Sequence, residues 1–411
     1  MADDDFRAHL FPVDDPRISA FRGLSYREYA EAVKSDPFAG PMIVDWATRY
    51  PVPYRGVSHD GNITAQPPAE LRAGEAAPTE AMVAAAELLL AGLSERQRAD
   101  IGYPLRAGQW RSWANPEFLQ HDTGLRLEDL DHVSRHRALE LVRASLSEQG
   151  FESVKTLMWV NGYLGETIDL ANVMNDASYN VAIYGTPSTS QPWGWQLFGH
   201  HLALNCVVDG ERMTVSPAFL GAEPSLIRES PIGPVDVFGA RIAHARTLMA
   251  GLTPAEQAEA LSYPEMVDPA MPLGRLHPGD ERHLGGCFQD NRIVPFEGIL
   301  VGDLDEPTRA EVSAVAAAFL DHLPAGVAAA RLREIESRYD ETWFSWIGGW
   351  GEGDPFYFRI QSPVVMLELD HHCGVFLSNR TPAQFHVHTG IRTPNGGDYG
   401  GLLRAAEGGQ P

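Results

Sequence analysis

The chain has 411 residues, of which 44% are hydrophobic and 21% charged, so it can bury one large core or two moderate ones, as a globular enzyme does. Its 55 acidic and 32 basic residues give a formal net charge of -23, which repels polyanions and argues against a nucleic-acid partner. No apolar run approaches the length of about 18 residues that a membrane helix needs. The start, Met1 to Asp5, is acidic where a secretory signal is basic and then apolar. We therefore expect a cytoplasmic protein without a membrane partner.

The three cysteines, Cys206, Cys287 and Cys373, are far apart and form no CxxC pair. This pattern supports neither a disulfide framework nor a zinc ribbon, and we expect reduced, partly buried thiols. The sequence does not indicate an oligomeric state.

Residues 1–79 are expected to form an N-terminal extension. It holds a short helix over residues 26–33, Pro-rich turns around residues 51–53, and a loop rich in Pro, Ala and Gly over residues 66–78. Residues 80–411 are expected to form a single large α+β catalytic domain.

A helical hairpin occurs twice in that domain, over residues 86–104 and 245–264. The first copy continues a helix predicted over residues 80–93 from strong helix formers at helical spacing. In each copy a glycine ends one helix, and Ser94 or Thr253 caps the next, with Gln97 or Glu256 placed to close a capping box. We interpret both copies as scaffold. Further helices are predicted over residues 307–323 and 325–339.

Strands are predicted where β-branched and aromatic residues alternate between Gly, Pro and Asn. These segments are residues 181–184, 200–208, 212–215, 357–360, 364–369 and 384–388. Regular strand-helix-strand alternation and Gly-rich phosphate loops are both missing from the sequence, which disfavours a nucleotide cofactor. The expected fold class is α+β, with a mainly antiparallel sheet that carries the polar site and packs against several helical hairpins.

The first motif that could carry out chemistry is Gly199-His200-His201. Neighbouring residues of a strand point to opposite faces, so only one of the two histidines is expected to be a metal ligand. Periodicity makes His200 the more buried one, but the choice between His200 and His201 stays open. A core histidine beside a surface histidine is the alternative interpretation.

The second motif is the strand that ends in Glu368-Leu369-Asp370. Alternation places both carboxylates on one face, and we expect Glu368 to be a metal ligand. Asp370 is a candidate catalytic base, although a strand that simply ends in a polar turn would explain it equally well.

The third and most specific motif is His386-Val387-His388. A His-x-His pair on a strand presents both imidazoles on one face, which is a common way to begin a mononuclear metal site. Arg392 follows and could hold a substrate carboxylate or pair with Asp398, which is itself a second candidate base.

Aromatic and polar residues in these segments are candidates for substrate binding. They are Trp193, Trp195, Arg359, Gln361, Arg392 and Tyr399. The tryptophans could equally belong to the core.

Taken together, the phrases Trp193-Gly194-Trp195 with Gly199-His200-His201, residues 217–224, residues 358–363, and His386-x-His388 leading to Asp398-Tyr399-Gly400 resemble a bacterial and fungal family. That family is catalogued only as a domain of unknown function, number three thousand five hundred. The resemblance runs from about residue 80 to residue 403. In that family a histidine usually stands where this chain has Gln361, so the resemblance implies a change of chemistry or specificity there. The family name implies no reaction.

The leading hypothesis is a mononuclear non-haem metal-dependent oxidoreductase, an oxidase or oxygenase, acting on a small anionic or aromatic metabolite. The cofactor would be a first-row transition metal, with iron or copper preferred and zinc or manganese possible. Oxidation is preferred because imidazole-rich sites suit redox metals and the sequence reveals no separate general base. The alternatives are a metal-dependent hydrolase or lyase with Asp370 or Asp398 as base, and a non-catalytic metabolite-binding protein.

Overall fold

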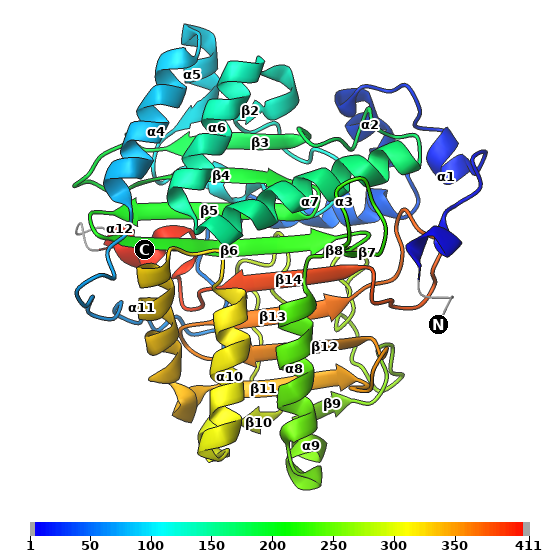
Figure 1. Cartoon of the computed structure of the whole chain (residues 1–411), viewed down its shortest axis with the longest axis vertical. Helices are drawn as coiled ribbons and strands as arrows, with labels where there is room; N and C mark the ends of the chain where they lie inside the picture. The colour runs from blue at the N-terminus through cyan, green and yellow to red at the C-terminus, as the bar shows by residue number, and fades with distance from the viewer. Residues whose placement is uncertain (1–4, 406–411) are drawn as a thin grey trace.

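The computed structural model describes residues 5–405, and the side chains of residues 5–403. Within this part, one sheet of 12 strands runs through the molecule in the order β1-β3-β4-β5-β6-β14-β13-β12-β11-β10, with β2 beside β3 and β9 beside β11 (Figure 1). The strands are β1 Gly102–Tyr103, β2 Leu125–Arg126, β3 Tyr179–Tyr184, β4 Trp193–Gly199, β5 Leu202–Asp209, β6 Arg212–Ala222, β9 Leu261–Tyr263, β10 Ile299–Leu300, β11 Trp343–Gly348, β12 Phe356–Gln361, β13 Met366–His371 and β14 Val387–Arg392. A separate ribbon pairs β7 Leu226–Ile227 with β8 Val235–Asp236.

The helices are α1 Pro16–Ser19, α2 Tyr26–Ala32, α3 Ala39–Arg49, α4 Thr79–Gly92, α5 Glu95–Ile101, α6 His132–Ser145, α7 Glu148–Thr167, α8 Gly239–Gly251, α9 Pro254–Ala260, α10 Glu306–Phe319, α11 Ala325–Glu336 and α12 Gly401–Ala405. In Figure 1 the long helices α4, α6, α7, α8, α10 and α11 lie in front of the sheet. The fold is therefore α+β, as expected. The sheet is mixed, however, because β1 runs parallel to β3 and β9 runs parallel to β11, while its other pairings are antiparallel.

The chain from α4 to β14 consists of two halves with the same order of elements. In each half a capped helical hairpin leads into a short strand, which pairs in parallel with the first strand of a four-stranded antiparallel meander. The first half is α4-α5-β1-β2-α6-α7-β3-β4-β5-β6, and the second is α8-α9-β9-β10-α10-α11-β11-β12-β13-β14. The halves join where β6 pairs antiparallel with β14. The duplication seen in the sequence as one hairpin thus extends to a whole half of the sheet.

The two hairpins have the predicted ends. Helices α4 and α8 end at Gly92 and Gly251, and the capping boxes of Ser94 with Gln97 and of Thr253 with Glu256 are both formed. The second short strand is longer than the first, because β9 spans three residues and β1 spans two.

The two faces of the sheet differ in character. Side chains such as Val181, Trp195, Leu367 and Val387 point to the helices and form the main apolar core. The opposite face, over β12, β13 and β14, carries polar and charged side chains. They are Tyr357, Arg359, Gln361, Glu368, Asp370, His388 and Arg392.

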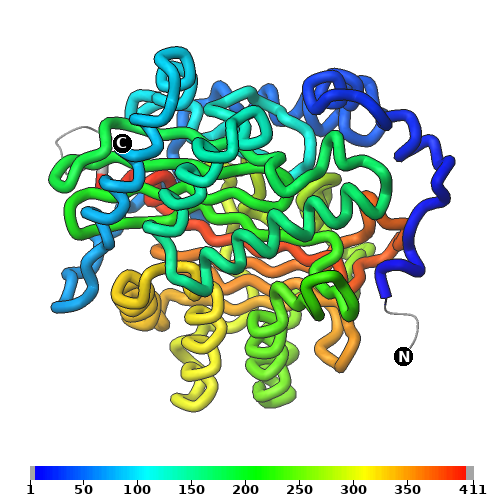
Figure 2. Tube along the Cα trace, turned by 45° about the horizontal axis from the view of Figure 1, so that its top comes forward, coloured from blue at the N-terminus to red at the C-terminus, as the bar shows by residue number. Residues whose placement is uncertain are grey.

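Irregular segments cover this polar face and bury it. The connections of residues 104–124 and 264–298 occupy equivalent places in the two halves, between β1 and β2 and between β9 and β10. The N-terminal helices join a second apolar core on this side, in which Tyr29 and Met42 meet Phe219 and Tyr399. In Figure 2 the N-terminal segment, in dark blue, runs along one end of the molecule and over its top. Because these segments enclose it, the polar face can form a dry site.

Other expectations can be compared directly with this fold. None of the helices in the described residues is long and apolar enough to cross a membrane. All three cysteines are free, with Cys206 and Cys287 buried and Cys373 partly exposed. The strand predicted over residues 384–388 lies further along, at β14, so His386 stands just before it.

Candidate metal centre

Three imidazoles meet at the junction of the two halves. The Nε2 atom of His388 lies 3.0 Å from Nε2 of His386 and 3.0 Å from Nε2 of His201. All three ligand atoms lie within 4.8 Å of one another, and all three side chains are buried. A transition metal binds imidazole nitrogen at about 2.0–2.1 Å, which a small ring rotation would permit for three nitrogens at this spacing.

Each of the three histidines is held in place by the backbone around it. His388 lies on β14, and His386 lies at its entrance, where its Nδ1 atom is 2.7 Å from the carbonyl oxygen of Cys373. A carbonyl only accepts, so this Nδ1 carries the proton and Nε2 presents its lone pair. His201 adopts a left-handed conformation, φ 58°, in the turn between β4 and β5.

Gly221 on β6 makes room for the group. A Cβ atom at this position would come within 2.9 Å of Cδ2 of His388 and 3.2 Å of Cδ2 of His201. The backbone N–H of Gly221 also donates to the carbonyl of His201 at 2.7 Å. Strand β6 therefore fixes the turn of His201 and leaves space for its ring.

Burial keeps the three imidazoles neutral. It lowers the pKa of His386 to about 4, and together with repulsion from neighbouring imidazoles it holds the pKa values of His201 and His388 well below their usual range. A neutral imidazole is the form that binds a metal. Nitrogen donors without a carboxylate suit first-row transition metals, whereas magnesium and calcium prefer oxygen. The residues present thus fit a transition metal.

The structure distinguishes His200 from His201. The His200 ring stacks on that of His201, with 3.9 Å between ring centroids, and its Nδ1 lies 2.8 Å from Oδ1 of Asn161. It has the protein partner that a buried imidazole requires and lies outside the three-nitrogen group. Both residues sit in a turn where strand alternation no longer applies, so periodicity could not show which of them joins the three-nitrogen group.

Beside the three imidazoles lies a second group that could hold a metal, formed by Glu281, Asp370 and His372. Asp370 accepts from the backbone N–H and Nε of Arg282, at 3.0 Å and 2.6 Å, and Arg282 also bonds Glu281. Nε2 of His372 lies 3.2 Å from Asp370. An arginine thus already compensates both carboxylates, which disfavours a cation there. Asp370, predicted as a base, is held by Arg282 and lies beside His372.

The three-imidazole group opens on a cavity of about 330 Å³. Its histidine wall contains His200, His201, His372 and His388, and Glu281 lines the same space. Much of the remaining wall comes from residues 11–42, with Asn115 to Phe118 and Gly374 to Phe376. This volume lies within the range of small-molecule sites.

Glu368, predicted as a metal ligand, lies elsewhere on the polar face. Its two oxygens accept from the backbone N–H groups of Leu284 and Gly285, at 2.8 Å and 2.9 Å, and from the Tyr357 hydroxyl at 2.7 Å. Residues two positions apart on a strand face the same side but lie about 7 Å apart. Glu368 therefore shares a face with Asp370 without reaching the histidines. Its oxygens anchor the covering segment 264–298.

Arg392, Asp398 and Tyr399, predicted as substrate-binding or catalytic residues, form a buried polar network. The Arg392 guanidinium pairs with Asp290 at 2.7 Å and with Asp398 at 2.9 Å, and it also donates to the carbonyls of Gly285 and Gly286. Asp398 further accepts from Ser216, and the Tyr399 hydroxyl donates to Asp290. These groups satisfy one another and do not line the cavity.

The other predicted substrate residues also lie away from the cavity. Arg359 pairs with Glu297, and Gln361 donates to the carbonyl of Val294 at 2.7 Å, so both hold the covering segment. Trp193 and Trp195 point to the helical side of the sheet, where the Trp195 indole donates to Ser145. Alternation along β4 places them opposite the histidines.

Sequence reasoning missed Glu281, His372 and Glu117 as cavity residues. His372 directly follows the strand motif, and its distance from Asp370 by two residues was a usable signal. Glu281 and Glu117 lie in irregular connections, where no periodicity assigns a direction. Glu281 adopts φ 44°, a strained conformation that is often found at functional sites.

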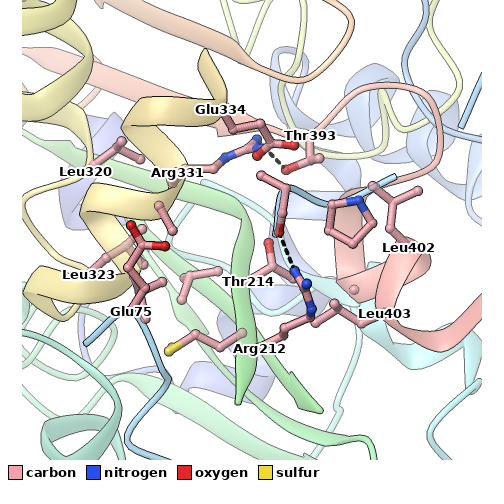
Figure 3. Close-up of a pocket in the computed structure, with 18 of the residues that line it drawn as sticks. Glu75, Arg212, Thr214, Leu320, Leu323, Arg331, Glu334, Thr393, Leu402 and Leu403 are labelled. Atoms are coloured by element: carbon pink, nitrogen blue, oxygen red, sulfur yellow. Dashed lines mark hydrogen bonds and ion pairs between the residues drawn. The ribbon is translucent and has the colours of Figure 1, made fainter. Parts of the chain in front are cut away.

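A smaller cavity of about 110 Å³ lies away from the three-imidazole group, between α11, β6 and the end of the described chain (Figure 3). Two arginines that line it already have partners. Arg331 pairs with Glu334 and donates to Thr393, and Arg212 donates to the carbonyl of Ala69. We assign no chemistry to it.

The fold and the site define an α+β protein, duplicated within one chain, with a candidate three-imidazole metal centre at the junction of its halves. Residues 75–401 match the model of the DUF3500 family, described as proteins of unknown function, and the chain belongs to that family. Neither a curated protein nor a solved structure matches the chain.

Proposed function

We propose that the chain is a metal-dependent enzyme that acts on a small molecule bound in the histidine-walled cavity. The metal is a first-row transition ion bound by Nε2 of His201, His386 and His388. The observation that carries this proposal is the convergence of three neutral imidazole nitrogens at the wall of a cavity that also presents a carboxylate. The free thiols agree with a cytoplasmic location, which we retain as part of the proposal.

The favoured chemistry is activation of a metal-bound water by zinc or manganese, in a hydrolase or lyase. Three neutral ligands leave the ion its full positive charge, which lowers the pKa of bound water. Glu281 supplies the proton acceptor that the sequence did not reveal. It lines the cavity, and its carboxylate is held by the backbone N–H of Cys373 at 2.8 Å and by Arg282. Asp370 and His372 support this wall.

Oxidation by iron or copper is the second candidate, as the sequence suggested. The observation that favours it is the purely imidazole ligand set, which suits redox metals. Iron or copper held by His201, His386 and His388 would supply a redox centre for dioxygen, and Glu281 would hold a proton beside it.

Metal analysis tests the proposal first. The wild-type protein is purified and loaded separately with zinc, manganese, iron(II) and copper, and the bound metal is counted by inductively coupled plasma mass spectrometry. We expect one equivalent of metal in the wild type, less than about one tenth in His386→Ala and in His388→Ala, and full occupancy in His136→Ala, an exposed histidine. Equal metal in all four proteins would refute the ligand set.

A cobalt(II) derivative separates the two chemistries. If water activation is correct, the visible spectrum of the cobalt protein changes with pH as the bound water ionises, and Glu281→Gln shifts that titration while metal remains bound. Glu265→Gln, at an exposed position, should behave as the wild type. A spectrum independent of pH from about 5.5 to 9, with dioxygen consumption by the iron or copper protein, would establish oxidation instead.

A further inference from the structure

The cavity has two ends of different chemistry. At one end stand the imidazoles and Glu281. The rest of the wall is largely apolar, includes several aromatic rings, and comes mainly from the N-terminal segment and two connections. Its rings are Phe11, Phe21, Tyr29, Phe38, Phe118 and Phe376. Phe376 lies between the aromatic rings and the imidazoles, because its ring makes an edge-on contact with that of His200 at 5.9 Å between centroids.

A carboxylate without a basic partner lies within the aromatic part. Glu117 lines the cavity and is less than half exposed, and its Oε1 atom accepts a hydrogen bond from the Tyr29 hydroxyl. Among residues 5–403, no arginine, lysine or histidine lies within 4.0 Å of this carboxylate. Burial raises its pKa to about 7, which is the response of a carboxyl group that lacks a compensating cation.

The two arginines that line the cavity do not form an ion pair with Glu117. Arg17 pairs with Asp15 at 2.7 Å, lies over the Phe11 ring and is half exposed. Arg380 also lines the cavity and is exposed. Both positive charges therefore stand at the solvent side, and the interior presents Glu117 and Glu281. An anionic ligand would meet the Glu117 carboxylate, which has no cation beside it, and Arg392, the expected anion anchor, is already saturated.

We propose that the Glu117 end of the cavity binds a protonated amine, so that the ligand is a small ammonium compound with an aromatic or aliphatic body. The ammonium group donates to Glu117, whose orientation Tyr29 fixes, and the body packs between the phenylalanine rings. Aromatic faces attract a nearby cation and add to this selectivity. The reacting part of the ligand then faces the imidazoles. The reaction of this ligand at the imidazoles rests on the proposed function, whereas binding of the amine at Glu117 does not.

The sequence origin of the two carboxylates strengthens the assignment. Glu117 belongs to the connection between β1 and β2, and Glu281 belongs to the equivalent connection between β9 and β10. Each half of the duplicated chain thus contributes one carboxylate to the same cavity. One stands beside the imidazoles, and the other is bonded to the N-terminal helix α2.

The experiment measures binding of three probes of similar shape to zinc-loaded protein by isothermal titration calorimetry at pH 8, where the Glu117 carboxyl is mostly ionised. The probes are 2-phenylethylamine, 2-phenylethanol and 3-phenylpropionate. We expect the amine to bind at least about tenfold more tightly than the other two, since a charge-assisted hydrogen bond contributes more than about 1.4 kcal/mol. Glu117→Gln should remove this preference, and Glu31→Gln, an exposed change on the same helix as Tyr29, should keep it.

Tyr29→Phe is the second variant, and it should weaken the preference without abolishing it. Circular dichroism and metal content are measured on every protein, so that a misfolded variant is recognised. Equal binding of the three probes to the wild type, or an unchanged amine preference in Glu117→Gln, would overturn the inference. If the wild type holds no metal but keeps the preference, the amine site stands and the proposed function fails. If the wild type binds metal but shows no preference for the amine, the proposed function stands and the amine site is refuted.

Discussion

The Nε2 atoms of His201 and His388 lie 3.0 Å apart although 187 positions separate the two residues in the chain. One comes from the turn that follows β4 in the first half, and the other from β14 in the second. The candidate centre therefore exists only when both halves of the duplicated sheet are folded against each other. Metal binding should consequently stabilise the pairing of β6 with β14, since a ligand that binds only the folded state adds to its stability.

The two adjacent histidines predict opposite phenotypes. His201→Ala should abolish metal binding, because it removes one of three ligand nitrogens. His200→Ala should retain most of the metal while losing stability, because it leaves Oδ1 of Asn161 without its partner at 2.8 Å. Metal content is measured on the two variants and the wild type after metal loading. Thermal unfolding is measured on the same three proteins without metal. Loss of metal in His200→Ala with retention in His201→Ala would reverse our assignment.

Much of the fold was accessible from the sequence. The capping boxes at Ser94 and Thr253 use local interactions, so sequence spacing alone located them. The His386-x-His388 pair was found for the same reason, because alternation along one extended segment is a local property. The parallel pairings of β1 and β9 were not predicted, since strands of two or three residues carry too little pattern to reveal a partner.

Residues whose partners are distant in sequence could not be placed from the local pattern. Strand alternation placed Glu368 on the same face as Asp370, but the sequence could not show that segment 264–298 returns to bond both Glu368 and Arg392. A buried charged residue resembles a ligand until its partner is known. Glu117 and Glu281 line the cavity but were not singled out from the sequence. An irregular connection has no periodicity that would show which of its carboxylates faces a cavity.

Glu368→Gln tests whether that residue is structural. The amide would turn an N–H₂ group toward the backbone donors of Leu284 or Gly285 and lose one acceptor. We expect the apo protein to lose about 2–4 kcal/mol of unfolding free energy, measured by urea denaturation. The metal content should remain at one equivalent. A variant of normal stability that had lost its metal would restore Glu368 as a ligand.

Arg392→Met should act on stability in the same way and more strongly. Removing this guanidinium leaves Asp290 and Asp398 buried with one fewer cation each, which costs about 3–5 kcal/mol when one partner of a buried ion pair is lost. Metal affinity and amine binding of the protein that folds should match the wild type. As a control, Arg143→Met removes an exposed ion pair with Glu140 and should cost less than about 1 kcal/mol. A stable Arg392→Met protein with selectively weakened ligand binding would contradict the structural role.

Acid should destabilise the protein partly through His322, a buried residue outside the candidate centre. Its Nδ1 lies 3.0 Å from the carbonyl of Phe319, and burial, helped by the Arg241 charge, lowers its pKa to about 4. The unfolded chain has an ordinary pKa near 6.5 and so takes up a proton first. The stability due to neutral His322 is thus complete above about pH 6.5 and is lost as the pH falls toward 4, by at most about 1.4 kcal/mol per pH unit. Urea unfolding of the metal-free wild type and His322→Gln at pH 8, 6 and 5 should show a smaller loss in the variant. Parallel losses in the two proteins would mean that His322 does not titrate on unfolding in this range.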